Sequence, residues 1–330
     1  MLSGGRDRGL DAARGVALLS MFVAHFAPVA GPGKVLTLSE HLTAFLFVLL
    51  IGCGAELGRR SPGRWRSSQV RAAALVVVGL LLMQLPTQIV VVLVWLGLMS
   101  LLAMWISHLP AWAIAATGVL AAVVEPPLLD WARDWLAKGG HDVISTAAVD
   151  IAFGGGSYRL AAFVLPACAG ILLVRLARAD RARTLVAGAA AAVIVALFVL
   201  DQAGTALLVP YSGSLQEIVF NTALALAVAG LTWVVAPRLS VLGTVLAGAG
   251  AMALTIYTLQ IVGDWAYFKG GGATDDRWVI LVGACVGALV LGAAWLPVAR
   301  ATGWRGPLEG PVDALARGKW PSRTAGGRGA

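Results

Sequence analysis

Ten windows of the sequence are each apolar enough and long enough to form a helix that crosses a membrane. The hydrocarbon core of a bilayer is about 30 Å thick, and a helix needs roughly twenty apolar residues to span it. We therefore expect an all-α polytopic membrane protein with about ten transmembrane helices in one bundle. The windows lie at residues 11–30, 38–58, 70–86, 88–106, 111–129, 158–178, 183–202, 216–236, 241–263 and 277–298.

Composition excludes a soluble globular chain. Of the 330 residues, 59% are hydrophobic and 13% are charged, and the mean hydropathy is +0.83, which is typical of integral membrane proteins. We expect one transmembrane domain over residues 1–298 and a basic cytoplasmic tail over residues 299–330. Cys53, Cys168 and Cys285 are isolated in apolar runs, so we expect no disulfide framework and no metal site.

The basic residues are concentrated in alternate loops. If both termini are cytoplasmic, nineteen of the 25 lysines and arginines fall on the inner side, and eleven of the 17 acidic residues fall on the outer side. This positive-inside pattern predicts cytoplasmic termini, and it explains the net charge of +8 without a nucleic-acid partner. The N-terminus imitates a secretory signal, but Asp11 and Arg14 interrupt its apolar run, so we expect the first helix to be retained.

Three local features predict where helices end. Pro86 and Thr87 alone separate the third and fourth windows, which predicts a tight hairpin. Glu125-Pro126-Pro127 predicts that the fifth helix ends or breaks there, because proline lacks an N–H and clashes with the preceding turn. Residues 130–157 form the longest outer segment, and we expect a loop that covers an outward-facing pocket. Its run Gly154-Gly155-Gly156 lacks the lysine and hydroxyl residue of a phosphate-binding loop.

The first window carries three ionisable residues, Asp11, Arg14 and His25. The eleven residues from Arg14 to His25 turn through three revolutions plus about 20° and climb roughly 16 Å, so both side chains lie on one helix face. Ionisable groups in hydrocarbon are costly and usually face a bundle interior or a wet cavity, which favours a functional site here. The alternative is structural, with Arg14 reaching the cytoplasmic rim and His25 as a neutral, hydrogen-bonded packing residue.

Few other polar residues interrupt the apolar windows. Glu40 and His41 lie at the outer entrance of the second window, and Glu56 lies near its cytoplasmic end. Glu56 is at a depth similar to that of Arg14, so the two either pair between helices or serve a ligand. The ninth window holds a further set that is typical of interhelical hydrogen bonds: Thr255, Tyr257 and Gln260, with Asp264 at its outer end.

Several stretches resemble one group of membrane proteins. The spacing of Arg14 and His25 in the first window resembles the signature of the membrane acyltransferase-3 proteins. The whole chain is similar to bacterial relatives of the heparan-α-glucosaminide N-acetyltransferase catalytic domain and of the neighbouring domain of unknown function 418. The stretches that carry this likeness also include residues 45–54, 211–214, 251–260 and 305–309.

The resemblance implies a function and a location. It implies transfer of an acyl group, usually acetyl, from cytoplasmic acyl-CoA to a hydroxyl or amine of a sugar-like or lipid-linked acceptor. It also implies a multi-pass protein of the bacterial plasma (inner) membrane. The chain departs from the family pattern at Tyr211 and Gln260, where the resemblance leads us to expect histidine, and His41 is displaced by about one position. Such departures leave open a changed acceptor or a loss of activity.

These considerations assign roles to eight residues. We expect Arg14 and Glu56 to bind acyl-CoA, since a guanidinium suits phosphate. We expect His25, or alternatively His41, to act as a general base or to carry the acyl group covalently. The expected substrate-binding residues are Tyr211, Gln260, Tyr257 and Asp264.

The partners and two other functions stay open at this point. The lipid bilayer, acyl-CoA and the acceptor are the expected partners, and a homodimer is left open. A transporter of a small or lipid-linked solute would use the same polar seam. A non-catalytic membrane scaffold would keep the fold and use His25 for packing alone.

Overall fold

The computed structural model describes residues 7–28, 36–59, 61, 63–154, 156–204, 208–272 and 274–318. Several basic residues of the predicted charge pattern lie outside these ranges, as does the end of the predicted tail: Arg6, Lys34, Arg60, Lys319, Arg323 and Arg328.

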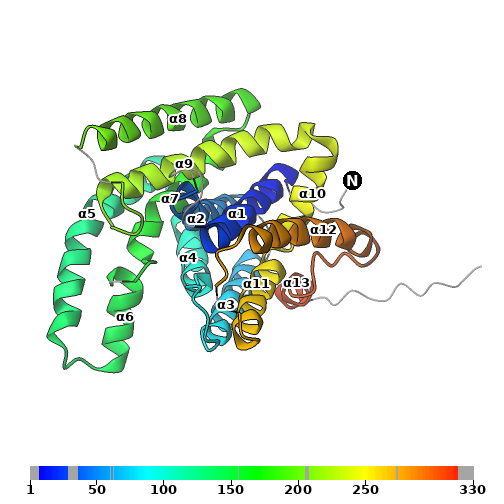
Figure 1. Cartoon of the computed structure of the whole chain (residues 1–330). Coiled ribbons are helices and arrows are strands. Elements are labelled where there is room, and N and C mark those ends of the chain that lie inside the picture. Colours follow the sequence, from blue (N-terminus) through cyan, green and yellow to red (C-terminus); the bar gives the residue numbers. More distant parts are fainter. Residues whose placement is uncertain are drawn as a thin grey trace, which may run out of the picture.

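Helices account for all the regular structure in these ranges (Figure 1). The α-helices are α1 Arg8–Phe26, α2 Leu38–Gly58, α3 Arg64–Leu82, α4 Leu93–Ile106, α5 Ala111–Lys138, α6 Val143–Phe153, α7 Leu160–Leu176, α8 Asp180–Gln202, α9 Leu215–Val235, α10 Ser240–Ala251, α11 Ala253–Lys269, α12 Trp278–Thr302 and α13 Glu309–Arg317, with a 3₁₀ turn at Ala236–Arg238.

The all-α membrane fold is confirmed at the level of candidate spans. Within the described residues, seven helices are long and apolar enough to cross a membrane, and α10 and α11 together make an eighth with a 71° bend. The remaining two windows hold α4 and α7, which are apolar but have only 14 and 17 residues. Each predicted window therefore contains a helix, while the count of ten crossings stays a prediction.

The central and the peripheral helices differ in how much of their apolar surface is buried inside the protein. In α1 and α2, 61% and 50% of the most apolar window is buried inside the protein, whereas in α8 the share is 6%. Figure 1 shows α8 at the periphery beside α9. Because apolar surface without protein neighbours suits lipid, α8 is a lipid-facing helix and α1 and α2 belong to the centre of the bundle.

Glycines allow the central helices to approach closely. A Cβ atom at Gly170 of α7 would lie 1.9 Å from the Leu49 carbonyl oxygen of α2, and one at Gly52 would lie 2.1 Å from the Ala167 carbonyl oxygen. A Cβ at Gly250 of α10 would similarly lie 1.9 Å from the Asp11 carbonyl oxygen of α1. Contacts between small residues take the place of the hydrophobic driving force that soluble bundles use.

Helix α5 does not end at its proline pair, contrary to the prediction. It runs from Ala111 to Lys138 with Pro126 and Pro127 inside it. Proline has a φ angle that suits a helix, so its cost is the missing hydrogen bond and the local clash. Tertiary contact offsets that cost, because the preceding Glu125 is buried and held by Arg159 at 2.6 Å.

The predicted outer loop at 130–157 is also wrong, since most of it is helical. The end of α5 and the whole of α6 form a hairpin that projects from the bundle (Figure 1). The Asp142 carboxylate caps α6 by accepting from the Ile144 and Ser145 N–H groups. A hydrogen bond from the Ser145 hydroxyl and these two backbone bonds lower the pKa of Asp142. The His141 ring stacks on Trp135 with 3.5 Å between centroids.

The tight hairpin predicted at Pro86 and Thr87 is replaced by a longer connection. Helix α3 ends at Leu82 and α4 begins at Leu93, and the non-helical Ile89, Val91 and Val92 between them are buried. The Val92 N–H donates to the Tyr257 hydroxyl at 3.1 Å. Irregular backbone at membrane depth requires such a partner from the protein, because lipid offers none.

The close contact between α2 and α7 generates a stability prediction. Gly170→Ala places a methyl group against the α2 backbone, so we expect a loss of about 1–3 kcal/mol. Gly188→Ala on α8 is the matched control, since its Cβ meets open space and alanine favours helix. Thermal unfolding in detergent measures both, and equal midpoints for the two variants would contradict the packing argument.

Candidate functional site

The turn before α9 is organised by the Glu217 carboxylate. One oxygen accepts from the Tyr211 N–H at 2.7 Å, and the other accepts from the Gly213 N–H at 2.7 Å and from the Ser212 hydroxyl at 3.1 Å. Tyr211 has a φ of 62° and is the one non-glycine residue with positive φ in the described ranges. Such a conformation persists only where surrounding contacts fix it, so Glu217 determines where Tyr211 points.

His41 joins this carboxylate through one amide. Its Nδ1 lies 2.7 Å from the Asn221 Oδ1, and the Asn221 Nδ2 donates to Glu217 at 3.2 Å. The three side chains are 5%, 1% and 3% exposed. We call His41, Asn221 and Glu217 the His41 relay; it connects the first turn of α2 to the first two turns of α9.

A buried ion pair borders the same turn. Arg159 and Glu125 are 2.6 Å apart, with side chains 3% and 1% exposed. Arg159 also donates to the Gly156 carbonyl at 3.0 Å and to the Tyr211 carbonyl at 3.5 Å. Because buried charges are costly unless paired and hydrogen-bonded, this pair fixes α5, α7 and the Tyr211 turn relative to one another.

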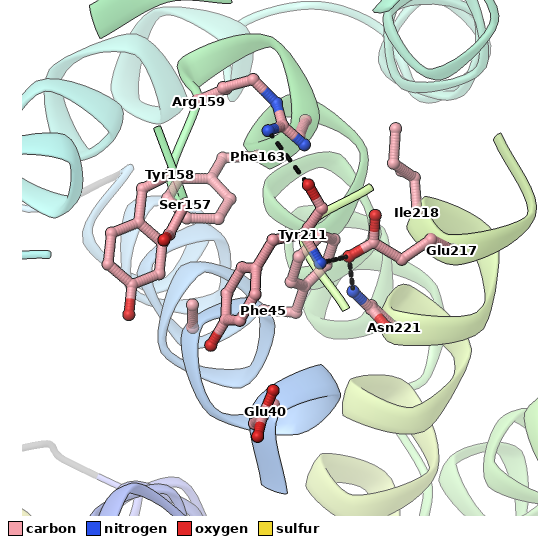
Figure 2. Close-up of a pocket in the computed structure, with 12 residues that line it drawn as sticks. Glu40, Phe45, Ser157, Tyr158, Arg159, Phe163, Tyr211, Glu217, Ile218 and Asn221 are labelled. Carbon is pink, nitrogen blue, oxygen red and sulfur yellow. Dashed lines mark hydrogen bonds between the residues drawn. The ribbon is translucent and has the colours of Figure 1, made fainter. Parts of the chain in front are cut away.

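Arg159, Tyr211, Glu217 and Asn221 line a small pocket (Figure 2). Its volume is about 10 Å³, which is space for about one water. Burial raises the pKa of Tyr211, and the nearby Tyr158 and Glu40 add to the effect, so the Tyr211 phenol is protonated and able to donate. The polar lining includes Glu40, Tyr158, Arg159, Tyr211 and Asn221, and the apolar part includes Phe45 and Phe163.

Two other predicted residues meet elsewhere. The Gln260 Nε2 of α11 lies 2.6 Å from the His25 Nδ1 of α1, while the Gln260 Oε1 is buried without a partner. Asp264 follows one turn later and is 4% exposed, and neither of its carboxylate oxygens has a hydrogen-bond partner in the described chain. Tyr257 accepts from Val92, so its hydroxyl caps α4.

The predicted pairing of Arg14 with Glu56 does not occur. Glu56 pairs with Arg175 of α7 at 2.6 Å and with Arg59 at 3.2 Å, and Arg14 pairs with Asp11 in its own helix at 2.6 Å. Glu56 pairs with Arg175 because that guanidinium is held next to it, where it also donates to the Ser107 and Leu109 carbonyls at 2.7 Å each.

The tail returns to the break between α10 and α11. Glu309 accepts from the Thr255 N–H at 2.9 Å and from its hydroxyl at 2.6 Å, so it satisfies an amide in the first turn of α11, which has no partner within the helix. Asp313 binds Arg71 of α3 at 2.9 Å and Arg305 at 3.1 Å. Two of the stretches singled out from the sequence, 251–260 and 305–309, are therefore neighbours.

Sequence reasoning missed much of this cluster around the Tyr211 turn. It selected His41 and Tyr211 but not Glu217, Asn221 or Arg159, which connect them. A signal existed, because Glu217 and Asn221 lie four residues apart at the start of an apolar window, and Ser214 with Glu217 has the spacing of a capping box. The Arg159–Glu125 pair had no such signal, since its members are 34 residues apart.

Residues 6–138 match the family described as heparan-alpha-glucosaminide N-acetyltransferase, catalytic. The match bears out the resemblance for this part of the chain, which is less than half of it, and it covers α1 to α5, including Arg14, His25, His41 and Glu56. Tyr211 and Gln260 lie outside the matched residues. No curated protein and no solved structure matches the chain.

The buried ion pair yields the second prediction. Arg159→Met leaves the Glu125 charge buried without its partner, so we expect a loss of about 3–5 kcal/mol. The double variant with Glu125→Leu also removes the unpaired buried charge, so it should recover most of the lost free energy of unfolding. Unfolding of both variants in detergent measures the difference, and a double variant less stable than Arg159→Met would show that the pair itself supplies net stability.

Proposed function

We propose, with the relationship of residues 6–138 to that acetyltransferase family as the premise, that the chain is a membrane acyltransferase. It transfers an acyl group, acetyl in the first instance, from cytoplasmic acyl-CoA to a hydroxyl or amine of a sugar-like or lipid-linked acceptor. The family match is the observation that carries this proposal. The polar residues buried in and between apolar helices are consistent with it.

The proposal includes ten crossings of a bacterial inner membrane, with both termini in the cytoplasm. Here α4 and α7 each cross, and α10 and α11 count as one crossing. The contacts support this arrangement, since they join helix ends that the charge pattern assigns to the same side. Glu56 and Arg175 end α2 and α7 on the inner side, and His41 and Asn221 lie near the starts of α2 and α9 on the outer side.

The inner end of α1 is the proposed place for acyl-CoA. The Arg14 side chain is 20% exposed and is oriented by Asp11, and it lies beside α10, since a Cβ at Gly250 would be 3.0 Å from the Arg14 Cβ. An oriented guanidinium suits phosphate. The roughly 16 Å of helix rise from Arg14 to His25 is comparable to an extended pantetheine arm.

The outer pocket is the proposed place for the acceptor. Aromatic faces with a carboxylate, a guanidinium and phenols are groups that bind hydroxyl-rich molecules, and Glu40, Tyr158, Arg159 and Tyr211 supply the polar part. The pocket has space for about one water, so acceptor binding requires the Tyr211 turn or the α5–α6 hairpin to move.

The third prediction tests the reaction. The purified protein in liposomes should release CoA thiol from acetyl-CoA only when an acceptor such as an amino sugar is present, with the acetyl group recovered on that acceptor. Protein without acetyl-CoA, and liposomes without protein, are the controls. If acetyl-CoA neither binds nor reacts with any sugar, amine or lipid-linked acceptor, the transporter or scaffold function replaces this one.

The fourth prediction concerns acyl-CoA binding. Arg14→Ala should weaken binding about 10-fold or more, because a hydrogen bond to a charged group contributes about 1.5–3 kcal/mol. Arg14→Lys should recover part of the loss, since lysine keeps the charge and loses the planar fork. Calorimetry with a non-hydrolysable acyl-CoA measures this. Arg238→Ala, an exposed arginine that pairs with Asp180, is the control, and equal affinity in wild type and Arg14→Ala would restrict Arg14 to structure.

A further inference from the structure

We propose that Asp264, Asp275 and Gln260 hold one hard divalent cation, of the class of Ca²⁺ or Mg²⁺, where α11 meets its connection to α12. The site is independent of the proposed acyl transfer. It gives Gln260 and Asp264 an ion in place of the substrate that the sequence led us to expect. It also differs from the absence of a metal site that we expected from the isolated cysteines.

Three buried oxygen atoms near the end of α11 have no hydrogen-bond donor. They are the Gln260 Oε1 and both carboxylate oxygens of Asp264, and the two residues are 7% and 4% exposed. These atoms are half of the six buried side-chain atoms without a partner in the described chain. The two residues are four apart, so they lie on one face of α11 and about 6 Å apart along it. A buried carboxylate is costly unless its charge is compensated, so this face requires a ligand with positive charge.

The connection between α11 and α12 brings a second carboxylate to this face. The Tyr267 hydroxyl donates to the Thr274 carbonyl at 2.9 Å, which folds the connection back against the last turns of α11. The next residue, Asp275, is half-buried, and its carboxylate interacts with that of Asp264 at hydrogen-bonding range. Ionised carboxylates only accept, so at this range the two groups repel each other and form no hydrogen bond.

No basic side chain compensates this pair of charges. Within the described residues, neither Asp264 nor Asp275 forms a salt bridge. Lys269 is the basic residue nearest to Asp264 in the sequence, and its ammonium lies over the Trp265 ring, 4.8 Å from the ring centroid. A proton or a cation from solution is left to neutralise the two carboxylates.

The number of unpartnered oxygens favours a cation over a shared proton. One proton between the two carboxylates satisfies one oxygen of each, and it leaves the other Asp264 oxygen and the Gln260 Oε1 without a partner. A hard cation binds several oxygens at once. Ca²⁺ takes carboxylate, amide and water oxygens, and Mg²⁺ is held by one or two carboxylates with waters in its other positions. The described chain has no cluster of three or more His, Cys, Asp or Glu that could hold a metal ion, so water completes the coordination.

A bound ion connects three parts of the fold. The Gln260 amide that offers its oxygen to the ion also places its Nε2 2.6 Å from the His25 Nδ1. The ion therefore holds the α11–α12 connection, α11 and the end of α1 in one arrangement. Because Asp275 is only half-buried, the ion reaches the site from water.

The fifth prediction is that the ion reverses an order of stability. For the purified full chain in detergent with a chelator, Asp264→Asn should unfold at a higher temperature than wild type, because it removes an uncompensated buried charge. With Ca²⁺ or Mg²⁺ at about 100 times its Kd, the wild-type midpoint should rise by about 5 °C, while Asp264→Asn and Asp275→Asn should not respond. Asp276→Asn is the matched control, because this exposed neighbour accepts from the Thr274 hydroxyl, and it should respond as wild type does.

Direct binding completes the test. Isothermal titration with CaCl₂ and with MgCl₂ should show one site in wild type for at least one of the ions, and Asp264→Asn should weaken it about 10-fold or more, since even an outer-shell partner contributes that much. No response to either ion, or equal binding by wild type and the Asp264→Asn, Asp275→Asn double variant, overturns the proposal. So does a wild-type midpoint that ignores both ions and rises on acidification, because the carboxylates then share a proton. None of these measurements uses acyl transfer, so failure of the proposed function does not affect them.

Discussion

The Glu217 carboxylate is the contact on which one end of the bundle depends, where α2 and α9 begin. It satisfies the amides of the Tyr211 turn and orients the Asn221 amide that holds His41. Polar groups in a bundle surrounded by lipid have no water to bind, so each must find a partner inside the protein. One acidic side chain at the start of α9 thereby fixes a strained turn, a histidine ring and the contact between α2 and α9.

The opposite end of the bundle, where α2 ends, follows the same rule with different partners. Glu56 is bound by Arg175, which also satisfies carbonyls at the turn between α4 and α5. Glu309 from the tail satisfies Thr255 where α11 starts after its 71° bend. A broken helix requires such a contact, because its exposed amides have no neighbour in the same helix. The tail therefore contributes a contact that stabilises the membrane domain.

Close packing of small residues sets the framework in which these polar contacts form. Gly170 against Leu49 and Gly250 against Asp11 bring α7 and α10 onto the two central helices. Helices such as α8, with little of their surface inside the protein, complete the boundary with lipid. The division between buried and lipid-facing helices cannot be read from hydropathy, because lipid and protein interior are similarly apolar.

The sequence by itself determined the all-helical membrane class, the approximate position of the helix in each apolar window, and His25, His41, Tyr211 and Gln260 as residues worth examining. These predictions follow from local properties, because a single segment shows how long an apolar run is and which polar groups interrupt it. Only the tertiary structure decided which polar groups meet. Asn221 contacts His41, which is 180 residues away in the sequence. Glu56 pairs with Arg175 and not with Arg14. Helix α5 continues through its two prolines beside Arg159. Each outcome depends on how helices far apart in sequence pack together, which no local pattern encodes.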